Sequence, residues 1–321
     1  MTFWERRASL RAPRLSTTAT GLVTAATIAL GAIATVTIDA FPTASNIRGL
    51  CLSVSLIGII AVGLSFITIA GQVFSLSIPA LVALCTITFA SSGHLGVAAA
   101  VLLTVVLGTA IGAIQGVVVG RFAADPIIVT IASAAILVGL GQLWTNGQTV
   151  LSDGDNTVLN VNLLGFLPFQ TAVFLVLTIA VLGLLRQTVF GRQLTLFGLN
   201  ERAALLSGYR RTVIITAAFA ISGATTGLAG ALLAAQSNQG QLMSGAGLGF
   251  DAIVAVVVGG VAIAGGIGTP VGAAVGAVFA GLLNNVASLA GLSYEMQLVT
   301  EGALILLVVL LSGFLNGRST R

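Results

Sequence analysis

The sequence predicts an all-α, polytopic integral membrane protein, and three observations support that fold class. Hydrophobic residues make up 57% of the 321 residues and charged residues only 7%, with a mean hydropathy of +1.10. A soluble domain carries about 25% charged residues. Apolar runs close to the roughly 20 residues that a helix needs to cross a bilayer recur along the chain, and the arginines fall between them. We therefore expect residues 1–321 to form a single transmembrane domain of about ten helices.

The spans are placed where apolar runs follow charged or turn-forming segments. The first runs from about Thr17 to Ile38, longer than the roughly 7–15 apolar residues of a signal peptide, so a retained helix is expected. The third is interrupted by Gly71 and Pro79, and a broken helix is tolerated only where protein or a cavity shields its backbone. The expected spans begin near Thr17, Gly49, Val73, Leu95, Pro126, Phe169, Thr212, Gly247, Thr269 and Tyr294.

Arginine placement orients these spans. With ten spans and a cytoplasmic N-terminus, only Arg48 of the 13 basic residues falls outside, in agreement with the positive-inside rule. Both termini are then cytoplasmic, with tails at residues 1–16 and 316–321, and residues 188–211 form a cytoplasmic loop. The cytoplasmic arginines are Arg6, Arg7, Arg11, Arg14, Arg121, Arg186, Arg192, Arg202, Arg210, Arg211, Arg318 and Arg321.

Several kinds of chemistry are not expected on this chain. It contains no lysine, and a Walker A phosphate loop needs a lysine on the β- and γ-phosphates, so ATP hydrolysis and a bound cofactor are not expected. The only histidine, His94, has no cluster of ligand residues around it, so no metal site and no catalytic residues are expected. Scattered arginines favour membrane orientation over nucleic-acid binding.

Glycines recur every four residues in two of the expected spans. That spacing puts them along one helix face, where a second helix approaches closely. The pattern predicts a tightly packed bundle and gives no information about a transported solute. The helix-packing glycines are Gly108, Gly112, Gly116 and Gly120 in the fourth span and Gly268, Gly272 and Gly276 in the ninth.

The cytoplasmic loop contains a predicted short helix. Asn200 is a good N-cap, Glu201 puts a negative charge in the first turn, and Gly208 ends the helix at C′. Three apolar residues at i, i+4 and i+7 predict a narrow docking stripe on one helix face. They are Leu199, Ala203 and Leu206.

A carboxylate at the centre of a membrane span raises the free energy of insertion by about 2.5–3.5 kcal/mol. We expect Asp251 near the outer end of its span, where it is hydrated. Glu301 lies about two turns into the tenth span, where it should face a polar cavity or a partner.

Four segments in chain order resemble permease subunits of the ribose-type ABC sugar importers, within a superfamily that also holds branched-chain amino-acid permeases. Residues 198–208, GLNERAALLSG, resemble the family's GGN-E-A-A-x-LSG segment. Residues 251–260, DAIVAVVVGG, followed by GGIG at 265–268, resemble LDAIAAVVLGG…GGxG. Residues 282–285, LLNN, and residues 126–130, PIIVT, followed by TNG at 145–147, are similar to two further segments of the family. The chain departs from the family pattern at Ser75, Pro79, Gln115 and Glu301.

The resemblance implies one half of an importer in the bacterial cytoplasmic (inner) membrane, crossing it many times. Its expected partners are a second permease subunit, identical or paralogous, a cytoplasmic ATPase dimer that carries ATP and Mg, and a periplasmic or lipid-anchored solute-binding protein. A pentose-like monosaccharide is the expected solute. Residues implied in coupling to the ATPase are Leu199, Asn200, Glu201, Ala203, Ala204, Leu206, Ser207 and Gly208. Candidates for the translocation pathway are Ser75, Ser77, Asp251, Asn284, Asn285 and Glu301.

Three alternatives stay open at this point. One alternative is an ABC permease for a nucleoside or a branched-chain amino acid. An ion-coupled secondary transporter would use Glu301 or Asp251 as its coupling carboxylate. A non-transporting membrane scaffold is compatible with the glycine pattern alone.

Overall fold

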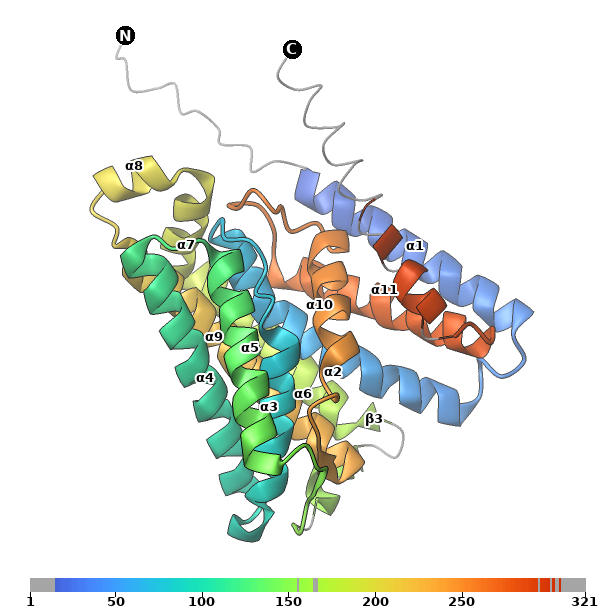
Figure 1. The fold of residues 1–321 in the computed structure, drawn as a ribbon. Coiled ribbons are helices and arrows are strands. Elements are labelled where there is room, and N and C mark those ends of the chain that lie inside the picture. Colours follow the sequence, from blue (N-terminus) through green and yellow to red (C-terminus); the bar gives the residue numbers. More distant parts are fainter. Residues whose placement is uncertain are drawn as a thin grey trace.

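The computed structural model describes residues 15–154, 156–163, 167–293, 295–300, 302–303 and 306, which fold into a bundle of helices (Figure 1). The helices are α1 (Leu15–Thr37), α2 (Ala44–Ile69), α3 (Ile78–Ser91), η1 (Gly93–Leu95), α4 (Val97–Phe122), α5 (Pro126–Thr145), η2 (Thr157–Asn160), α6 (Phe169–Gln187), α7 (Val189–Leu199), α8 (Glu201–Leu206), α9 (Arg211–Ser237), α10 (Ala246–Val258) and α11 (Pro270–Leu289). The strands are β1 (Val150–Leu151), β2 (Asn162–Leu163), β3 (Leu167–Pro168) and β4 (Gln239–Gly240).

Seven helices in the described part of the chain are long and apolar enough to cross a membrane. They are α1, α2, α4, α5, α6, α9 and α11, while α3 and α10 are apolar but shorter. This confirms an all-α polytopic membrane protein without confirming ten full spans. Two expected spans are half-length helices, and the tenth, expected from Tyr294, lies mostly outside the described residues.

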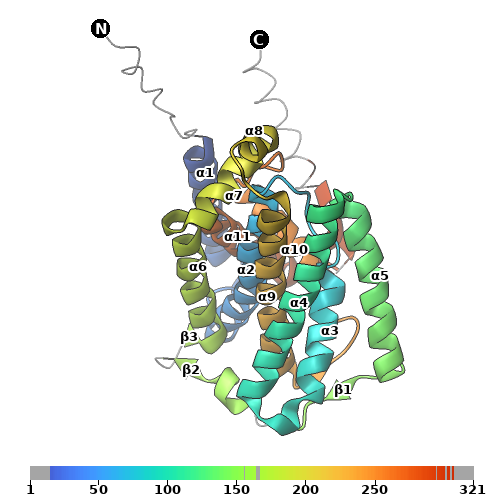
Figure 2. The same cartoon turned by 90° about the vertical axis from the view of Figure 1, so that its left-hand side faces the viewer.

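The centre of the bundle is built around α2 and α9. Every residue of α2 from Val54 to Ile69 is buried, and α4 lies along α9 (Figure 2). Helices α1, α5 and α6 lie at the periphery and expose large apolar side chains such as Leu22, Leu143 and Ile179. An apolar exterior is the surface that a bilayer requires of a membrane-spanning protein.

The predicted glycine face of α4 packs directly on α9. A Cβ added to Gly108 would lie 2.3 Å from the carbonyl oxygen of Gly223, and one on Gly112 would lie 2.3 Å from the carbonyl oxygen of Phe219. The contact is mutual, since a Cβ added to Gly223 would lie 2.1 Å from the carbonyl oxygen of Gly108. The two backbones therefore touch, as the small-residue spacing predicts. Gly116 and Gly120 continue the same contact with Thr216 and Thr212.

The second glycine series is confirmed only in part. Gly272 and Gly276 lie in α11 and face the backbone of α10 at Gly259 and Ala255. Gly268 precedes the helix and has a φ of +136°. It therefore belongs to a turn, and its inclusion in a helical stripe is wrong.

The two half-length helices, α3 and α10, meet in the interior of the bundle. The chain is non-helical at residues 71–77 before α3 and has no regular helix at residues 241–245 before α10. A Cβ on Gly245 would lie 2.2 Å from the carbonyl oxygen of Pro79, and one on Gly249 would lie 2.4 Å from Pro79 Cγ. From this contact α10 runs toward the end of the bundle that carries α8, and α3 runs toward the opposite end (Figure 1). The two helices thus begin N-terminus to N-terminus.

The end of the bundle opposite α8 is closed by short paired segments (Figure 2). Strand β1 pairs with β4 and β2 with β3, both antiparallel. The Asn156 amide nitrogen donates to Ser152 Oγ at 3.1 Å and to Asn238 Oδ1 at 2.9 Å, which ties the segment between α5 and α6 to the end of α9. The described residues between α5 and α6 therefore form a hydrogen-bonded cap on this end of the bundle.

Candidate functional site

The predicted short helix is α8, and its predicted caps are present. Asn200 accepts a hydrogen bond from the Ala203 amide at 3.0 Å, as an N-cap side chain does. Gly208 has a φ of +84°, the left-handed conformation that ends many helices. Glu201 forms an ion pair with Arg211 at 2.7 Å, which joins α8 to the start of α9. Local sequence signals therefore located this helix correctly.

A second helix, α7, precedes α8 and was not expected within the loop at 188–211. Thr188 caps it by accepting a hydrogen bond from the Gly191 amide at 3.1 Å. Leu194 and Phe197, three residues apart, are buried on its inner face. The threonine cap and this spacing are visible in the sequence and are the signals that could have located α7.

The predicted docking stripe does not lie on one helix. Leu199 is the last residue of α7, and Asn200 has extended backbone (φ −157°, ψ 96°), so the i, i+4, i+7 relation is broken there. Leu206 is 90% exposed and Leu199 57% exposed, and Ala203 is exposed between them. The three side chains are accessible, but Ala204 is buried at 4% exposure and contributes to packing instead.

Ser75 and Ser77 lie in the non-helical segment before α3, where they bond to each other and to α4. Their hydroxyl oxygens are 2.9 Å apart. The amide of Gln115 on α4 lies against Ser77 Oγ, with Nε2 at 2.9 Å and Oε1 at 3.2 Å. All three side chains are at least 95% buried. The network holds the non-helical segment to α4.

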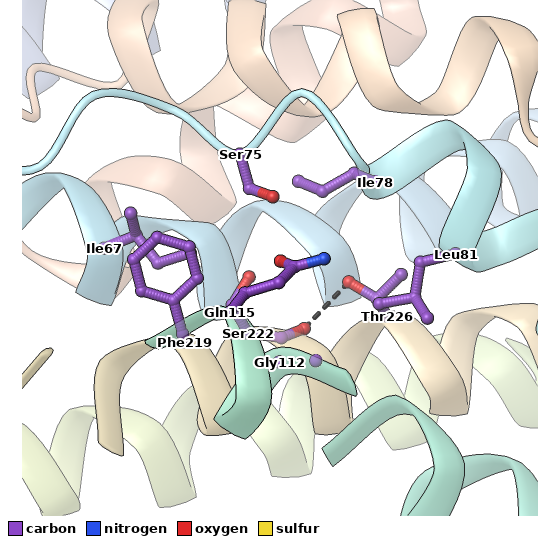
Figure 3. A pocket seen from close by; sticks show the side chains of 10 residues that line it. Ile67, Ser75, Ile78, Leu81, Gly112, Gln115, Phe219, Ser222 and Thr226 are labelled. Atoms are coloured by element: carbon purple, nitrogen blue, oxygen red, sulfur yellow. Dashed lines mark hydrogen bonds between the residues drawn. The ribbon is translucent and has the colours of Figure 1, made fainter. Parts of the chain in front are cut away.

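A small cavity adjoins this network (Figure 3). Polar groups of Ser75, Gln115, Ser222 and Thr226 line it from three separate elements, with apolar residues around them. Its volume is about 10 Å³, comparable to one water molecule. This space is too small for a sugar.

The remaining polar candidates form two separate pairs. Asn284 on α11 donates to Asp251 Oδ1 on α10 at 2.8 Å. Asn285 exchanges amide hydrogen bonds with Asn46 on α2 at 2.7 and 3.1 Å. These two asparagines thus tie α11 to two different helices.

Asp251 lies deeper than expected. Helix α10 begins beside Pro79, at the N-terminus of α3 in the interior of the bundle. From there the 14 residues of α3 extend about 20 Å, at 1.5 Å per residue, toward the end of the bundle opposite α8. The expectation that Asp251 lies near an outer span end is therefore wrong, and its pairing with Asn284 replaces the expected hydration. Glu301 lies outside the described residues.

The sequence of the chain is similar to those of known transport proteins. A family model described as "Branched-chain amino acid transport system / permease component" matches residues 46–309. The chain is 34% identical over 302 residues to an L-arabinose ABC transporter permease protein of Azospirillum brasilense, covering 88% of this chain and 84% of that one. It is 33% identical over 272 residues to the ribose import permease protein of Bacillus subtilis, covering 83% and 84%. No solved structure matches the chain.

Proposed function

The chain belongs to the family of branched-chain amino acid transport system permease components, and from this premise we propose that it is the membrane-spanning subunit of an ABC importer for a monosaccharide. The observation that carries the proposal is similarity over more than four fifths of the chain to permeases for L-arabinose and for ribose. Both sugars are pentoses, so a pentose-like solute is the narrower proposal. The protein spans the bacterial cytoplasmic membrane several times.

The surface of α8 is proposed as the dock for a separate ATPase. Helix α8 is short, capped at both ends and joined to α9 by an ion pair as well as by the chain. Its exposed Leu205 and Leu206 offer apolar area at this end of the molecule, and a few side chains that become buried at the centre of an interface carry most of its binding energy. ATP and Mg would then bind on the partner subunits.

The two ends of the bundle are assigned to different partners. Arginines cluster around α7 and α8, at Arg186, Arg192, Arg202 and Arg210, which favours a cytoplasmic position for that end. The cap that contains β1 and β4 then lies outside, where a solute-binding protein delivers the sugar. Both termini are cytoplasmic in this arrangement.

A second permease subunit completes the translocation pathway. A sugar has many hydroxyl groups and no charge, so it needs hydrogen-bond donors and acceptors along its route. The polar side chains of Asp251, Asn284 and Asn285 supply such groups from α10 and α11. The cavity near Ser75 holds about one water molecule, so passage of a sugar beside Ser75 requires the elements that line this cavity to move apart.

Uptake into proteoliposomes tests the proposal. The permease is reconstituted with its ATPase and binding protein, and labelled ribose, L-arabinose and leucine are supplied with ATP inside. We expect uptake of a pentose that stops when the ATPase is inactivated and continues when ionophores collapse ion gradients. Pentose uptake that persists without ATP hydrolysis and stops with the ionophores would instead establish the ion-coupled alternative, and uptake of leucine alone would establish an amino-acid permease.

A further inference from the structure

Three segments far apart in sequence meet at the base of the loop that carries α8. They are the end of α2 at Ile69 and Gly71, the end of α7 at Gly198, and the turn between α10 and α11 at Gly265 and Gly266. Figure 1 shows α8, the blue loop after α2 and the orange loop after α10 at the same end of the molecule. We call the four glycines the glycine junction.

The contact is made by backbone atoms. A Cβ on Gly198 would lie 1.9 Å from the carbonyl oxygen of Ile69 and 2.6 Å from the amide nitrogen of Gly266. A Cβ on Gly265 would lie 2.4 Å from Gly71 Cα. The Gly266 amide donates a hydrogen bond to the Ile69 carbonyl at 2.8 Å. Even the methyl group of alanine has no room at Gly198.

Backbone conformation imposes a second constraint at the same place. Gly71, Gly265 and Gly266 have φ values of +75°, +88° and +72°, a region that favours glycine because it has no Cβ. Close approach thus joins three segments, and left-handed backbone occurs in two of them, at Gly71 and at Gly265 and Gly266. Leu199 closes the contact from the other side, since its Cγ lies 2.5 Å from where a Cβ of Gly266 would be.

Both half-length helices, α3 and α10, are connected to this junction by short non-helical segments. Gly71 opens the non-helical segment that enters α3 through Ser77, and Gly265 and Gly266 lie in the turn that follows α10. The N-termini of α3 and α10 touch each other at Pro79. The α8 loop is therefore in contact with the connections of both helices that begin in the interior.

We propose that Gly71, Gly198, Gly265 and Gly266 are positioning residues that transmit movement of α8 to α3 and α10 at the same time. The inference rests on the proposed docking of an ATPase at α8. Close-packed backbones joined by a hydrogen bond have no rotamer to change, so they pass a displacement on rather than absorb it. A shift of Gly198 then moves the Ile69 carbonyl and the Gly266 amide together.

The first test is Gly198→Ala in the full complex with ATPase and binding protein. We expect ATP-driven sugar uptake to fall by about tenfold or more, with ATP hydrolysis and the amount of bound ATPase within about twofold of the wild type. The matched control is Gly183→Ala on α6, where an added Cβ meets nothing within 4 Å, and it should transport normally. Near-normal uptake by Gly198→Ala would overturn the proposal.

A second test needs no substitution. Hydrogen–deuterium exchange is measured on the wild-type complex with and without a non-hydrolysable ATP analogue. We expect residues 67–77, 196–208 and 259–269 to change exchange together, including the Gly266 amide. A change confined to residues 196–208 would contradict transmission. Failure of the proposed function gives a different result, because the wild-type complex itself would then show no ATP-driven uptake.

Discussion

At the scale of single residues, Asn200 shows how far local chemistry determines the candidate coupling loop. Its side chain caps α8, and Gly208 ends the helix with positive φ, and both roles follow from residue type alone. An N-cap residue has an extended backbone, so the cap already places Leu199 outside α8. The missed feature is that Asn200 also ends α7. Two adjoining helices share this residue, and a periodicity count across it joined side chains that lie on separate helices.

The exposed Leu206 gives a residue-scale prediction. Replacement Leu206→Glu places a charge on a side chain that is 90% exposed, so the fold should be unaffected. If α8 docks the ATPase, the affinity of the ATPase should fall by about tenfold or more, equivalent to about 1.4 kcal/mol. Pull-down of the ATPase with purified permease and thermal melting of the permease measure the two quantities.

The control for this variant is Leu151→Glu, which alters a leucine of similar exposure, 70%, at the opposite end of the bundle. It should leave ATPase binding unchanged. Equal ATPase binding by wild type and Leu206→Glu would remove α8 from the docking surface.

At the scale of elements, hydropathy predicted most helices but misjudged the two that begin in the interior. The span expected from Val73 includes most of residues 71–77, whereas the span expected from Gly247 begins after residues 241–245, and both are expected at full length. Residues 71–77 and 241–245 are not helical, and tertiary contacts hold them in place, with Gly245 packed on Pro79 and Ser77 bonded to Gln115. A count of apolar residues contains no information about these tertiary contacts. The glycine spacing, in contrast, predicted the α4–α9 interface because small residues act locally.

Packing of α4 on α9 gives a prediction at this scale. In Gly112→Leu the Cβ would lie 2.3 Å from the carbonyl oxygen of Phe219, and backbone cannot move aside as a side chain can. Overpacking of this kind lowers stability by about 1–3 kcal/mol, so the melting temperature of the purified permease should fall. Differential scanning fluorimetry in detergent measures it.

Gly139→Leu on α5 is the matched control, since a Cβ there meets nothing within 4 Å and faces the exterior. Its melting temperature should equal that of the wild type. If both variants melt at the wild-type temperature, the α4–α9 contact does not limit stability.

At the scale of the whole molecule, charge distribution predicts the orientation that the fold alone does not give. The bundle has one end with α7 and α8 and another with the β1–β4 cap (Figure 2). Arg192, Arg202, Arg210 and Arg211 belong to the first end, and arginine-rich loops stay in the cytoplasm. The prediction therefore combines sequence with structure, and neither is sufficient without the other.

Labelling of intact cells tests this orientation. In a background with Cys51→Ala and Cys85→Ala, single cysteines are introduced by Leu151→Cys or Leu206→Cys. A membrane-impermeant maleimide should label the first in intact cells and the second only after the membrane is opened. The reverse pattern would place α8 outside and exclude an ATPase dock there.

The meeting of α3 and α10 has an electrical consequence. Each helix N-terminus is equivalent to roughly half a positive elementary charge, so the two first turns beside Pro79 together present about one such charge inside an apolar core. Negative groups are stabilised close to the N-terminus of a helix, and Asp251, the sixth residue of α10, lies within two turns of that terminus, with Oδ1 accepting a hydrogen bond from Asn284. The meeting of two helix N-termini thus gives an electrostatic reason for a carboxyl group in the interior of a membrane protein.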